Sequence, residues 1–514
     1  MGRLAEPPIL SHVSLRLMLA ANFASLGFVM LAALIAMPIY LRKLGAEAYG
    51  LIGFYTVLTA GFQMLDVGLS QTLARECARF RAGALDARAL KRLLHVFEAI
   101  FGIVASIGAI GLVATSHSLA SNWLRVEKLP TESVASAIAL MGIAVPCQWA
   151  SGLYRGALNG LERQVLLAGL SISVNSARYF GVLLALALLG SRPGVFFGYQ
   201  AALALIELAL LAGTVRILFP AIRREGTADP IEVGRLVRFS AAISLATIAW
   251  MVQTQGDKAI LSKVLPLPRF GMFTLAVTAT AAVAGLSGPI GQALLPRLTR
   301  LIAQNDAAAI AGLYRRTTQL ACLVVMPPAM LLFFFAERVL WAWTGNTSVA
   351  HEAAPILKAY ALGSALLPIS AFPYYLQYAY GQLRLHVLAQ VIMLPTLLAG
   401  LTFAAVNYGA VGCGVVWTAV MLGALVVYAP VVHRKFAPRL HLRWLFIDVV
   451  PIMGGTALAA ALMASLLHLP TSRPLATGEL VCAGALIMVA GIVSSSAARA
   501  WILRAWRNDR ILGF

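Results

Sequence analysis

The chain contains few charged residues. Of its 514 residues, 12% are charged and 60% are hydrophobic, whereas an average soluble domain has about 25% charged and roughly 45–50% apolar residues. A water-soluble fold of this size needs far more polar surface than these side chains supply. The low charge therefore excludes a soluble enzyme and favours a chain that lies largely within a lipid bilayer.

Acidic residues are scarcer still, since 20 Asp and Glu stand against 40 Lys and Arg, which gives a formal net charge of +20. Such an excess commonly indicates a nucleic-acid partner. The basic residues here, however, fall in the short gaps between apolar runs, where they form no continuous groove with interleaved aromatic side chains. We therefore expect no nucleic-acid partner and interpret the basic residues as signals of membrane topology.

Cysteine and long polar loops are also lacking. The cysteines lie far apart and form no C-x-x-C pair, so we interpret them as small packing residues and expect no metal or cofactor. They are Cys77, Cys147, Cys322, Cys413 and Cys482. No gap between apolar runs exceeds roughly 25 residues, which leaves no room for a catalytic domain outside the membrane. We therefore expect a protein that is not an enzyme.

What the sequence has in abundance is apolar runs of about twenty residues, the length that crosses a hydrocarbon core roughly 30 Å thick. A window of about 19 residues finds about fourteen of them, which predicts an all-α integral membrane fold with about fourteen transmembrane helices. The runs cover approximately residues 17–40, 49–72, 93–115, 133–154, 165–189, 196–216, 239–262, 269–295, 317–340, 354–378, 386–406, 411–432, 445–467 and 479–499. The first run is longer than the core of a signal peptide, about 7–15 residues, so we interpret it as a retained helix.

Gaps rich in Arg and Lys alternate with poorer ones, and this indicates the orientation because cytoplasmic loops are enriched in these residues. Basic residues concentrate after the second, sixth, eighth and twelfth runs, and the C-terminal tail is basic as well. We therefore expect both termini in the cytoplasm, which agrees with an even number of helices.

The chain carries a weak internal repeat. A shift of about 221 residues brings features of the two halves into register, as in transporters that arose from duplicated halves. The matched features are Arg42-Lys43-Leu44 with Lys263-Val264-Leu265, Gln71 with Gln292, Pro146 near Pro368, and Gly160 with Gly381. The shift equals six helices, so we predict two six-helix lobes, residues 1–220 and 221–440, related by a pseudo-two-fold axis normal to the membrane. Residues 441–514 would add a helix pair and a basic cytoplasmic tail. Chance similarity between apolar segments is the alternative.

One segment resembles the first-hairpin signature of Wzx-type polysaccharide-biosynthesis flippases: residues 41–79 read LRKLGAEAYGLIGFYTVLTAGFQMLDVGLSQTLARECAR. The signature consists of a Leu-Gly-x-x-x-Tyr-Gly turn, an apolar helix, a Leu-Asp-x-Gly-Leu segment and a basic exit. Two further stretches are similar to that family, YRGALNGLERQ at 154–164 and QTQGDKAILSKVL at 253–265. The resemblance covers the helical core, while the last two helices match only in number.

The resemblance implies a member of the multidrug/oligosaccharidyl-lipid/polysaccharide exporter superfamily, with two six-helix lobes around a central, often cationic cavity. It implies that the chain moves undecaprenyl-pyrophosphate-linked oligosaccharide, for lipopolysaccharide or exopolysaccharide, from the cytoplasmic to the periplasmic leaflet of the bacterial inner membrane by alternating access. The expected partners are this lipid-linked glycan, membrane lipids and a periplasmic polymerase. Coupling to a proton or sodium gradient follows by analogy. The Arg-rich signature in the first helix of lipid II flippases is absent, which argues against peptidoglycan precursor as the cargo.

The sequence is compatible with two other functions. The first is export of small molecules, as in the multidrug branch of the same superfamily, which a highly apolar cavity would favour. The second is a membrane polysaccharide polymerase or ligase, which usually needs a sizeable periplasmic loop with catalytic side chains. The longest outward gap here, roughly residues 116–132, offers few such groups.

Two charged residues lie deep inside predicted helices. Arg178 is about 13 residues into its run and Glu207 about 11 into the next, so at about 1.5 Å per residue both come near the midplane and are close enough in depth to pair. An ionised group there costs roughly 2.5–3.5 kcal/mol and needs a partner, water or a function. In the functional interpretation, Arg178 attracts an anionic diphosphate or sugar acid, and Glu207 tunes that charge or carries a proton. In the structural interpretation, the two form an interhelical ion pair.

Three further residues are candidates for the substrate pathway. Asp257 and Lys258 lie near the periplasmic end of the seventh predicted helix. Because adjacent residues do not share a helix face, they cannot both point at one partner, and Lys258 can extend to the interface. The family resemblance implies that Asp257 faces the cavity. Asp66 belongs to the matched signature, and the alternative for it is an interfacial carboxylate that stabilises the hairpin.

Overall fold

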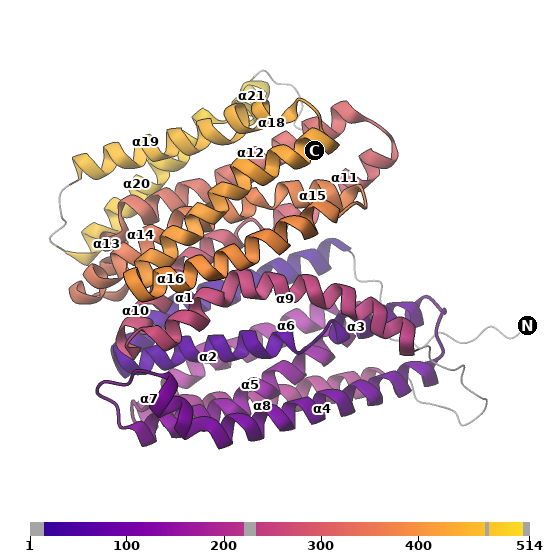
Figure 1. Ribbon diagram of the computed structural model, residues 1–514, viewed down its shortest axis with the longest axis vertical. Coiled ribbons are helices and arrows are strands. Elements are labelled where there is room, and N and C mark those ends of the chain that lie inside the picture. The colour runs from indigo at the N-terminus through magenta and orange to yellow at the C-terminus, as the bar shows by residue number, and fades with distance from the viewer. Residues whose placement is uncertain (1–14, 220–232, 468–471, 507–514) are drawn as a thin grey trace, which may run out of the picture. The chain divides into compact units, whose positions relative to one another are not determined.

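The computed structural model describes residues 15–219, 233–467 and 472–506, and the regular elements in these ranges are helices (Figure 1). In this part of the chain, 11 helices are long and apolar enough to cross a membrane, or up to 12 if one bent pair forms a single span. The chain is thus an all-α, multi-pass membrane protein, as its apolar runs predicted.

The predicted count of about fourteen spans is not confirmed. One difference lies in α16 (Arg384–Gly423), which continues to Phe436 as a single stretch of 53 residues. The backbone leaves the helical conformation at Gly409, where φ is 62° and ψ is −147°, a region open to glycine because it has no Cβ. The predicted runs 386–406 and 411–432 lie on either side of this glycine. The other difference is α9 (Val233–Val264), which is not among the 11 helices. The structure describes the side chains of this helix only in its later part.

The predicted run 49–72 is wrong as one straight helix. Helix α2 (Ala46–Met64) ends before a turn, and α3 (Leu69–Arg81) leaves that turn at 55° to it. The turn places Val67 at φ 45° and Gly68 at φ 71°, the left-handed region that glycine adopts without strain. The Leu-Asp-x-Gly-Leu segment of the sequence is therefore a bend between two helices.

By their contacts, the residues form two compact units whose boundaries differ from the predicted ones. Unit 1 comprises the chain up to Ala36, Leu58–Leu119 and Thr131–Ile248, and unit 2 comprises Met37–Val57, Ala120–Pro130 and the chain from Ala249 onward. The lobes at 1–220 and 221–440, with an added segment 441–514, stay a prediction from the repeat.

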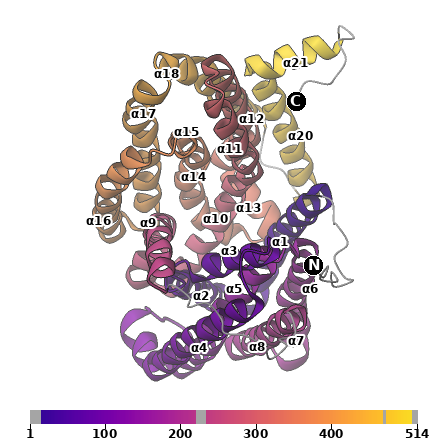
Figure 2. The same ribbon diagram turned by 90° about the vertical axis from the view of Figure 1, so that its right-hand side faces the viewer.

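Unit 1 is built around α5 (Thr131–Gly160). It packs against α3, α4 (Ala87–Ser118) and α8 (Pro193–Leu218), and Figures 1 and 2 show α4, α5 and α8 grouped together. Glycines let α3 and α5 approach closely, because a Cβ on Gly156 would meet the carbonyl oxygen of Ser70. Close backbone approach through small residues associates helices in lipid, where no hydrophobic force drives them together. Unit 1 also contains α6 (Gln164–Ser176) and α7 (Val182–Leu189), most of α1 (Leu15–Leu44) and the first half of α9.

Unit 2 is built around α14 (Thr347–Ser370). It packs against α10 (Leu267–Gly285), α12 (Ala307–Phe334), α13 (Ala336–Thr344) and α16. Gly363 of α14 lies against Trp417 and Thr418 of α16, again a contact that a larger residue would block. Its other helices include α11 (Gly288–Ala303), α15 (Phe372–Ala379), α17 (Ala429–Phe436), α18 (Leu440–Arg443) and α21 (Ser496–Trp506).

The last two long helices, α19 (Val450–Leu466) and α20 (Arg473–Ser494), pack against each other and against α12. A polar network reinforces this contact. Asp448 is fully buried and accepts hydrogen bonds from Arg315 Nε (2.6 Å) and Gln319 Nε2 (2.6 Å). Gln319 Oε1 in turn accepts from Ser495 Oγ at 2.7 Å. The pair is therefore fastened to α12 by buried hydrogen bonds as well as by apolar packing.

Replacing Gly156 with Ala lowers the thermal stability of the purified protein, because the added methyl group meets the backbone of α3. Overpacking of this kind costs about 1–3 kcal/mol. Gly169→Ala in α6 is the matched control, since that position faces open space and alanine favours a helix by about 1 kcal/mol. Thermal unfolding in one detergent compares the two variants. Equal stability of both would contradict the close α3–α5 contact.

Candidate functional site

Glu207 of α8 is 1% exposed and lies between two arginine side chains of unit 1. Arg178 Nη2 donates to Glu207 Oε2 at 2.5 Å, and Arg155 Nη2 of α5 donates to the other carboxylate oxygen, Oε1. A carboxylate can accept from two guanidinium groups because it offers two oxygens, and such charge-assisted bonds are the stronger ones in proteins. Three helical segments thus meet at one buried carboxylate.

Arg178 lies on a single π-helical turn, η2 (Ala177–Gly181), which joins α6 to α7. A π turn widens the helix and frees backbone carbonyls, and such turns recur at functional sites. Two side chains of α8 satisfy these carbonyls: Tyr199 Oη donates to Ala177 O at 2.9 Å, and Gln200 Nε2 donates to Arg178 O at 3.4 Å. Gln200 Oε1 also accepts from Arg178 Nη1 at 3.2 Å. Helix α8 therefore fixes both the backbone and the side chain of Arg178.

The cluster carries an excess of positive charge, because two guanidinium groups share one carboxylate. Exposure differs among the three side chains, at 42% for Arg155, 13% for Arg178 and 2% for Glu207. Arg155 is therefore the member that a ligand can reach most easily, while Glu207 holds the two arginines in place. A guanidinium group has five N–H donors, so it can bind an oxyanion while it keeps a contact to the carboxylate.

Arg178 and Glu207, which the sequence places at a similar depth, are in contact, and whether this contact is functional or structural stays a prediction. Arg155 was missed as a member of the cluster, because the predicted run ended at residue 154 while α5 continues to Gly160. The signal that could have found it is the stretch YRGALNGLERQ, in which Arg155 is the second residue.

Asp257 and Lys258 belong to α9 in unit 2 and have different partners. Asp257 is 8% exposed, and its Oδ1 accepts from the backbone N–H of Lys258 at 2.7 Å. Lys258 Nζ donates to Gln255 Oε1 at 2.8 Å. The side chain of Tyr360 lies beside Asp257. The expectation that the two adjacent charges do not share a partner is consistent with this geometry, and their place in a substrate pathway stays a prediction.

Asp66 lies in the turn between α2 and α3. Its Oδ1 accepts from the hydroxyl of Ser70 at 2.6 Å and from the backbone N–H of Ser70 at 3.2 Å. These bonds satisfy groups in the first turn of α3, which otherwise lack intrahelical acceptors. The contacts favour the hairpin-stabilising alternative for Asp66 over a role in binding substrate.

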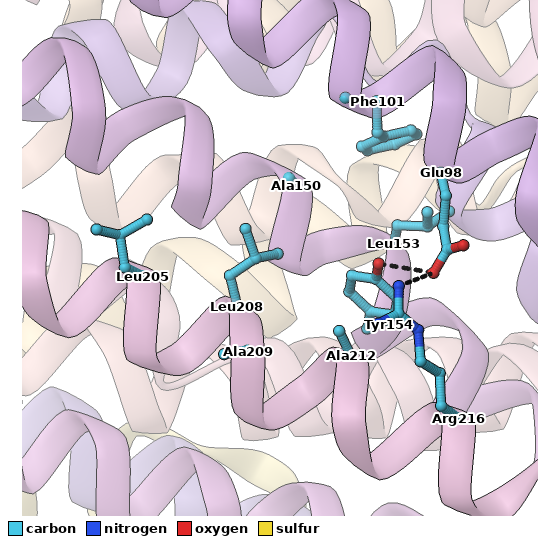
Figure 3. A pocket seen from close by; sticks show the side chains of 11 residues that line it. Glu98, Phe101, Ala150, Leu153, Tyr154, Leu205, Leu208, Ala209, Ala212 and Arg216 are labelled. Carbon is cyan, nitrogen blue, oxygen red and sulfur yellow. Dashed lines mark hydrogen bonds and ion pairs between the residues drawn. The ribbon is translucent and has the colours of Figure 1, made fainter.

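A recess with a volume of about 400 Å³ lies between α4, α5 and α8 of unit 1 (Figure 3). Its walls are mainly apolar, and Phe101, Leu153 and Leu208 are among them. Glu98, Tyr154 and Arg216 supply polar groups at one end. The residues of α8 that line the recess do not include Glu207. The recess and the arginine cluster are therefore separate features.

Metal ligands are not gathered in the part of the chain that the structure describes, where no group of three or more His, Cys, Asp or Glu could hold an ion. The buried acids of unit 1 and unit 2 instead accept hydrogen bonds from arginine, amide and backbone groups. The site chemistry that these residues support is binding of charged or polar groups.

The fold is similar to that of two solved transporters. A lipid II flippase, MurJ in an inward closed conformation, has a TM-score of 0.69 over 95% of this chain and 100% of that chain, at 12% sequence identity. A multidrug resistance MATE family transporter of the MOP superfamily, in an inward-facing conformation, has a TM-score of 0.60 over 81% of this chain and 100% of that chain, at 14% identity. The chain thus shares its fold with these two transporters.

Comparison of sequences identifies the family of the chain. Residues 19–302 match the family described as polysaccharide biosynthesis protein, which is more than half of the 514 residues. A protein of Shigella flexneri, named as a candidate O-antigen transporter, is 22% identical over 370 residues, which cover 70% of this chain and 84% of that protein. The chain belongs to the polysaccharide biosynthesis protein family, and the resemblance to Wzx-type flippases in its sequence is confirmed.

Glu207→Gln destabilises the protein more than Arg155→Gln. Loss of the shared carboxylate leaves two guanidinium groups side by side, one of them nearly buried, and removing one partner of a buried pair costs about 3–5 kcal/mol. Loss of Arg155, which is 42% exposed, leaves Glu207 paired with Arg178, and partly exposed ion pairs contribute at most about 1 kcal/mol. Thermal unfolding in detergent measures both variants. A larger loss of thermal stability in Arg155→Gln than in Glu207→Gln would contradict this arrangement of the cluster.

Proposed function

We propose that this protein flips undecaprenyl-pyrophosphate-linked oligosaccharide from the cytoplasmic to the periplasmic leaflet of a bacterial inner membrane. Membership of the polysaccharide biosynthesis family supports the glycan cargo, and the named function of the Shigella relative points the same way. The similarity in fold to MOP-superfamily transporters supports alternating access, in which the cargo is exposed to one side of the membrane at a time.

The observation that carries this proposal at the level of residues is the carboxylate of Glu207 shared by Arg155 and Arg178. A diphosphate offers oxygens that match the planar fork of a guanidinium group, so it can compete with Glu207 for the same donors. In our proposal Arg155, the more exposed of the two, meets the diphosphate first. Glu207 prevents irreversible binding of the diphosphate, because its carboxylate pairs with the two arginines again when the diphosphate leaves.

Several finer features belong to the same proposal. Both termini lie in the cytoplasm, as the distribution of Arg and Lys predicts. A proton or sodium gradient drives the cycle, with Asp257 and Lys258 as candidate residues of the pathway, and Asp66 holds the first hairpin. The delivered glycan passes to a periplasmic polymerase. Membrane lipids surround the prenyl chain of the cargo throughout.

A second candidate is export of apolar small molecules. The mainly apolar recess of about 400 Å³ in unit 1 favours it, since ligand pockets of roughly 300–1,000 Å³ with apolar walls suit small molecules. The two candidates differ in cargo and share the mechanism. A polymerase or ligase is not favoured, because the compared proteins are named as transporters and a flippase.

The first test follows the sidedness of lipid-linked glycans in cells depleted of the protein, with a membrane-impermeant probe. Undecaprenyl-linked repeat units accumulate on the cytoplasmic leaflet, and the wild-type gene restores their export. Arg178→Gln restores it poorly, because loss of a charge-assisted hydrogen bond, worth about 1.5–3 kcal/mol, lowers the rate about ten- to hundredfold. Arg192→Gln is the matched control, since Arg192 is an exposed arginine outside the cluster.

The amount of each variant in the membrane is measured in the same cells, so that loss of transport is separated from loss of protein. Glycans that reach the periplasm normally after depletion would overturn the proposed cargo. If drug sensitivity rises instead while glycan export continues, the second candidate holds. Full export by Arg178→Gln at a normal protein level would remove Arg178 from the mechanism.

A further inference from the structure

The recess of unit 1 has an apolar body and a polar end (Figure 3). Helix α4 contributes Phe101 and Gly102, α5 contributes Ala150 and Leu153, and α8 contributes small and apolar residues. The last group is Leu205, Leu208, Ala209 and Ala212. A methylene group takes up about as much space as a water molecule, roughly 30 Å³. A volume of about 400 Å³ therefore accommodates about a dozen methylene groups, which is most of one acyl chain.

The polar end consists of Glu98, Tyr154 and Arg216, from three different helices. Glu98 Oε1 accepts from the Tyr154 hydroxyl at 2.8 Å and from Arg216 Nη2 at 3.4 Å. The contact to the arginine is long, and the Arg216 side chain is 67% exposed while that of Glu98 is 16% exposed. Arg216 therefore keeps N–H donors that face outward from the mouth of the recess, and an anion can use them.

More positive charge lies at the same end of α4. Lys91, His95 and Glu98 are spaced at i, i+4 and i+7 and so share one helix face. Arg92 and His95 are exposed. Among the described residues on these helix faces, Lys91, His95 and Arg216 are basic and Glu98 is acidic. The electrostatic field at the polar end of the recess favours a ligand with a negatively charged head group.

The outer faces of the helices beside the recess are apolar. Ile100, Ile103 and Ile107 of α4 are 38%, 60% and 66% exposed, and Leu205 and Ile206 of α8 are 51% and 54% exposed. In a membrane-spanning chain such faces meet lipid. An empty apolar recess beside lipid would lose dispersion contacts along its whole wall, so a neighbouring hydrocarbon chain is the natural material to fill it.

We propose that this recess binds one anionic phospholipid, with an acyl chain along the apolar wall and the phosphate on Arg216. Packing alone selects no lipid, because hydrocarbon tails are as apolar as the side chains. The basic end supplies the selection, as basic pockets between membrane helices do for anionic head groups. Glu98 acts as the competitor that holds Arg216 in position when the head group leaves. The site is separate from the Arg155–Arg178 cluster.

Native mass spectrometry of the delipidated full-length protein tests the proposal, with phosphatidylglycerol and phosphatidylcholine of identical acyl chains as probes. Phosphatidylglycerol binds more tightly, and Arg216→Gln lowers that preference about fivefold, the effect of one basic residue near an anionic head group. Glu98→Gln raises the affinity, because it keeps the acceptor for Tyr154 and frees Arg216 from its ionic partner. A short-chain phosphatidylglycerol binds weakly to the wild-type protein, because it cannot fill the recess.

The opposite effects of the two variants separate a lipid site from a structural ion pair, which either substitution would weaken alike. Arg192→Gln, an exposed arginine away from the recess, leaves lipid binding unchanged. Equal binding of the two phospholipids, or an unchanged preference in Arg216→Gln, would overturn the proposal. So would selective binding of undecaprenyl phosphate with no binding of phosphatidylglycerol, because the recess would then belong to the cargo.

Discussion

The bilayer gives backbone and charged groups no water to bind, so each must find its partner inside the protein. The chain meets this constraint by forming helices, which satisfy their backbone groups within each segment, throughout the ranges that the structure describes. Turns that depart from the α-helix need help from side chains. At the π turn of residues 177–181, Tyr199 and Gln200 of α8 supply that help by donating to the freed carbonyls.

The same constraint explains how the scarce acidic residues are used. Glu207 accepts from two arginines, Asp448 from Arg315 and Gln319, and Glu47 from the backbone N–H groups of residues 127–129. A buried carboxylate costs less when several donors surround it. These three acids gather donors from distant parts of the sequence, whereas the buried Glu76 and Asp257 accept from near neighbours in the chain. These acids therefore join distant segments within each unit, and in our proposal the surplus arginines supply sites for anions.

The sequence predicted that Arg178 and Glu207 lie at a similar depth, close enough to pair, and the structure brings their side chains together. It did not predict Arg155, because a hydropathy window ends a helix where apolar character fades, and α5 continues for six residues beyond residue 154. It also treated residues 49–72 as one helix. A bend does not change the hydropathy of a segment. A hydropathy window therefore cannot detect the turn at Gly68, which has a positive φ.

Composition and the apolar runs along the sequence determined that this is a multi-pass helical membrane protein, because the free energy of transfer into lipid is set within each run and not by its neighbours in the fold. Its motifs determined the family. Only the tertiary structure decided which face of each helix meets which partner: Arg155 on Glu207, α19 and α20 on α12, and the recess between α4 and α8. These choices depend on shape and on distances between segments far apart in the chain, which a linear pattern does not contain.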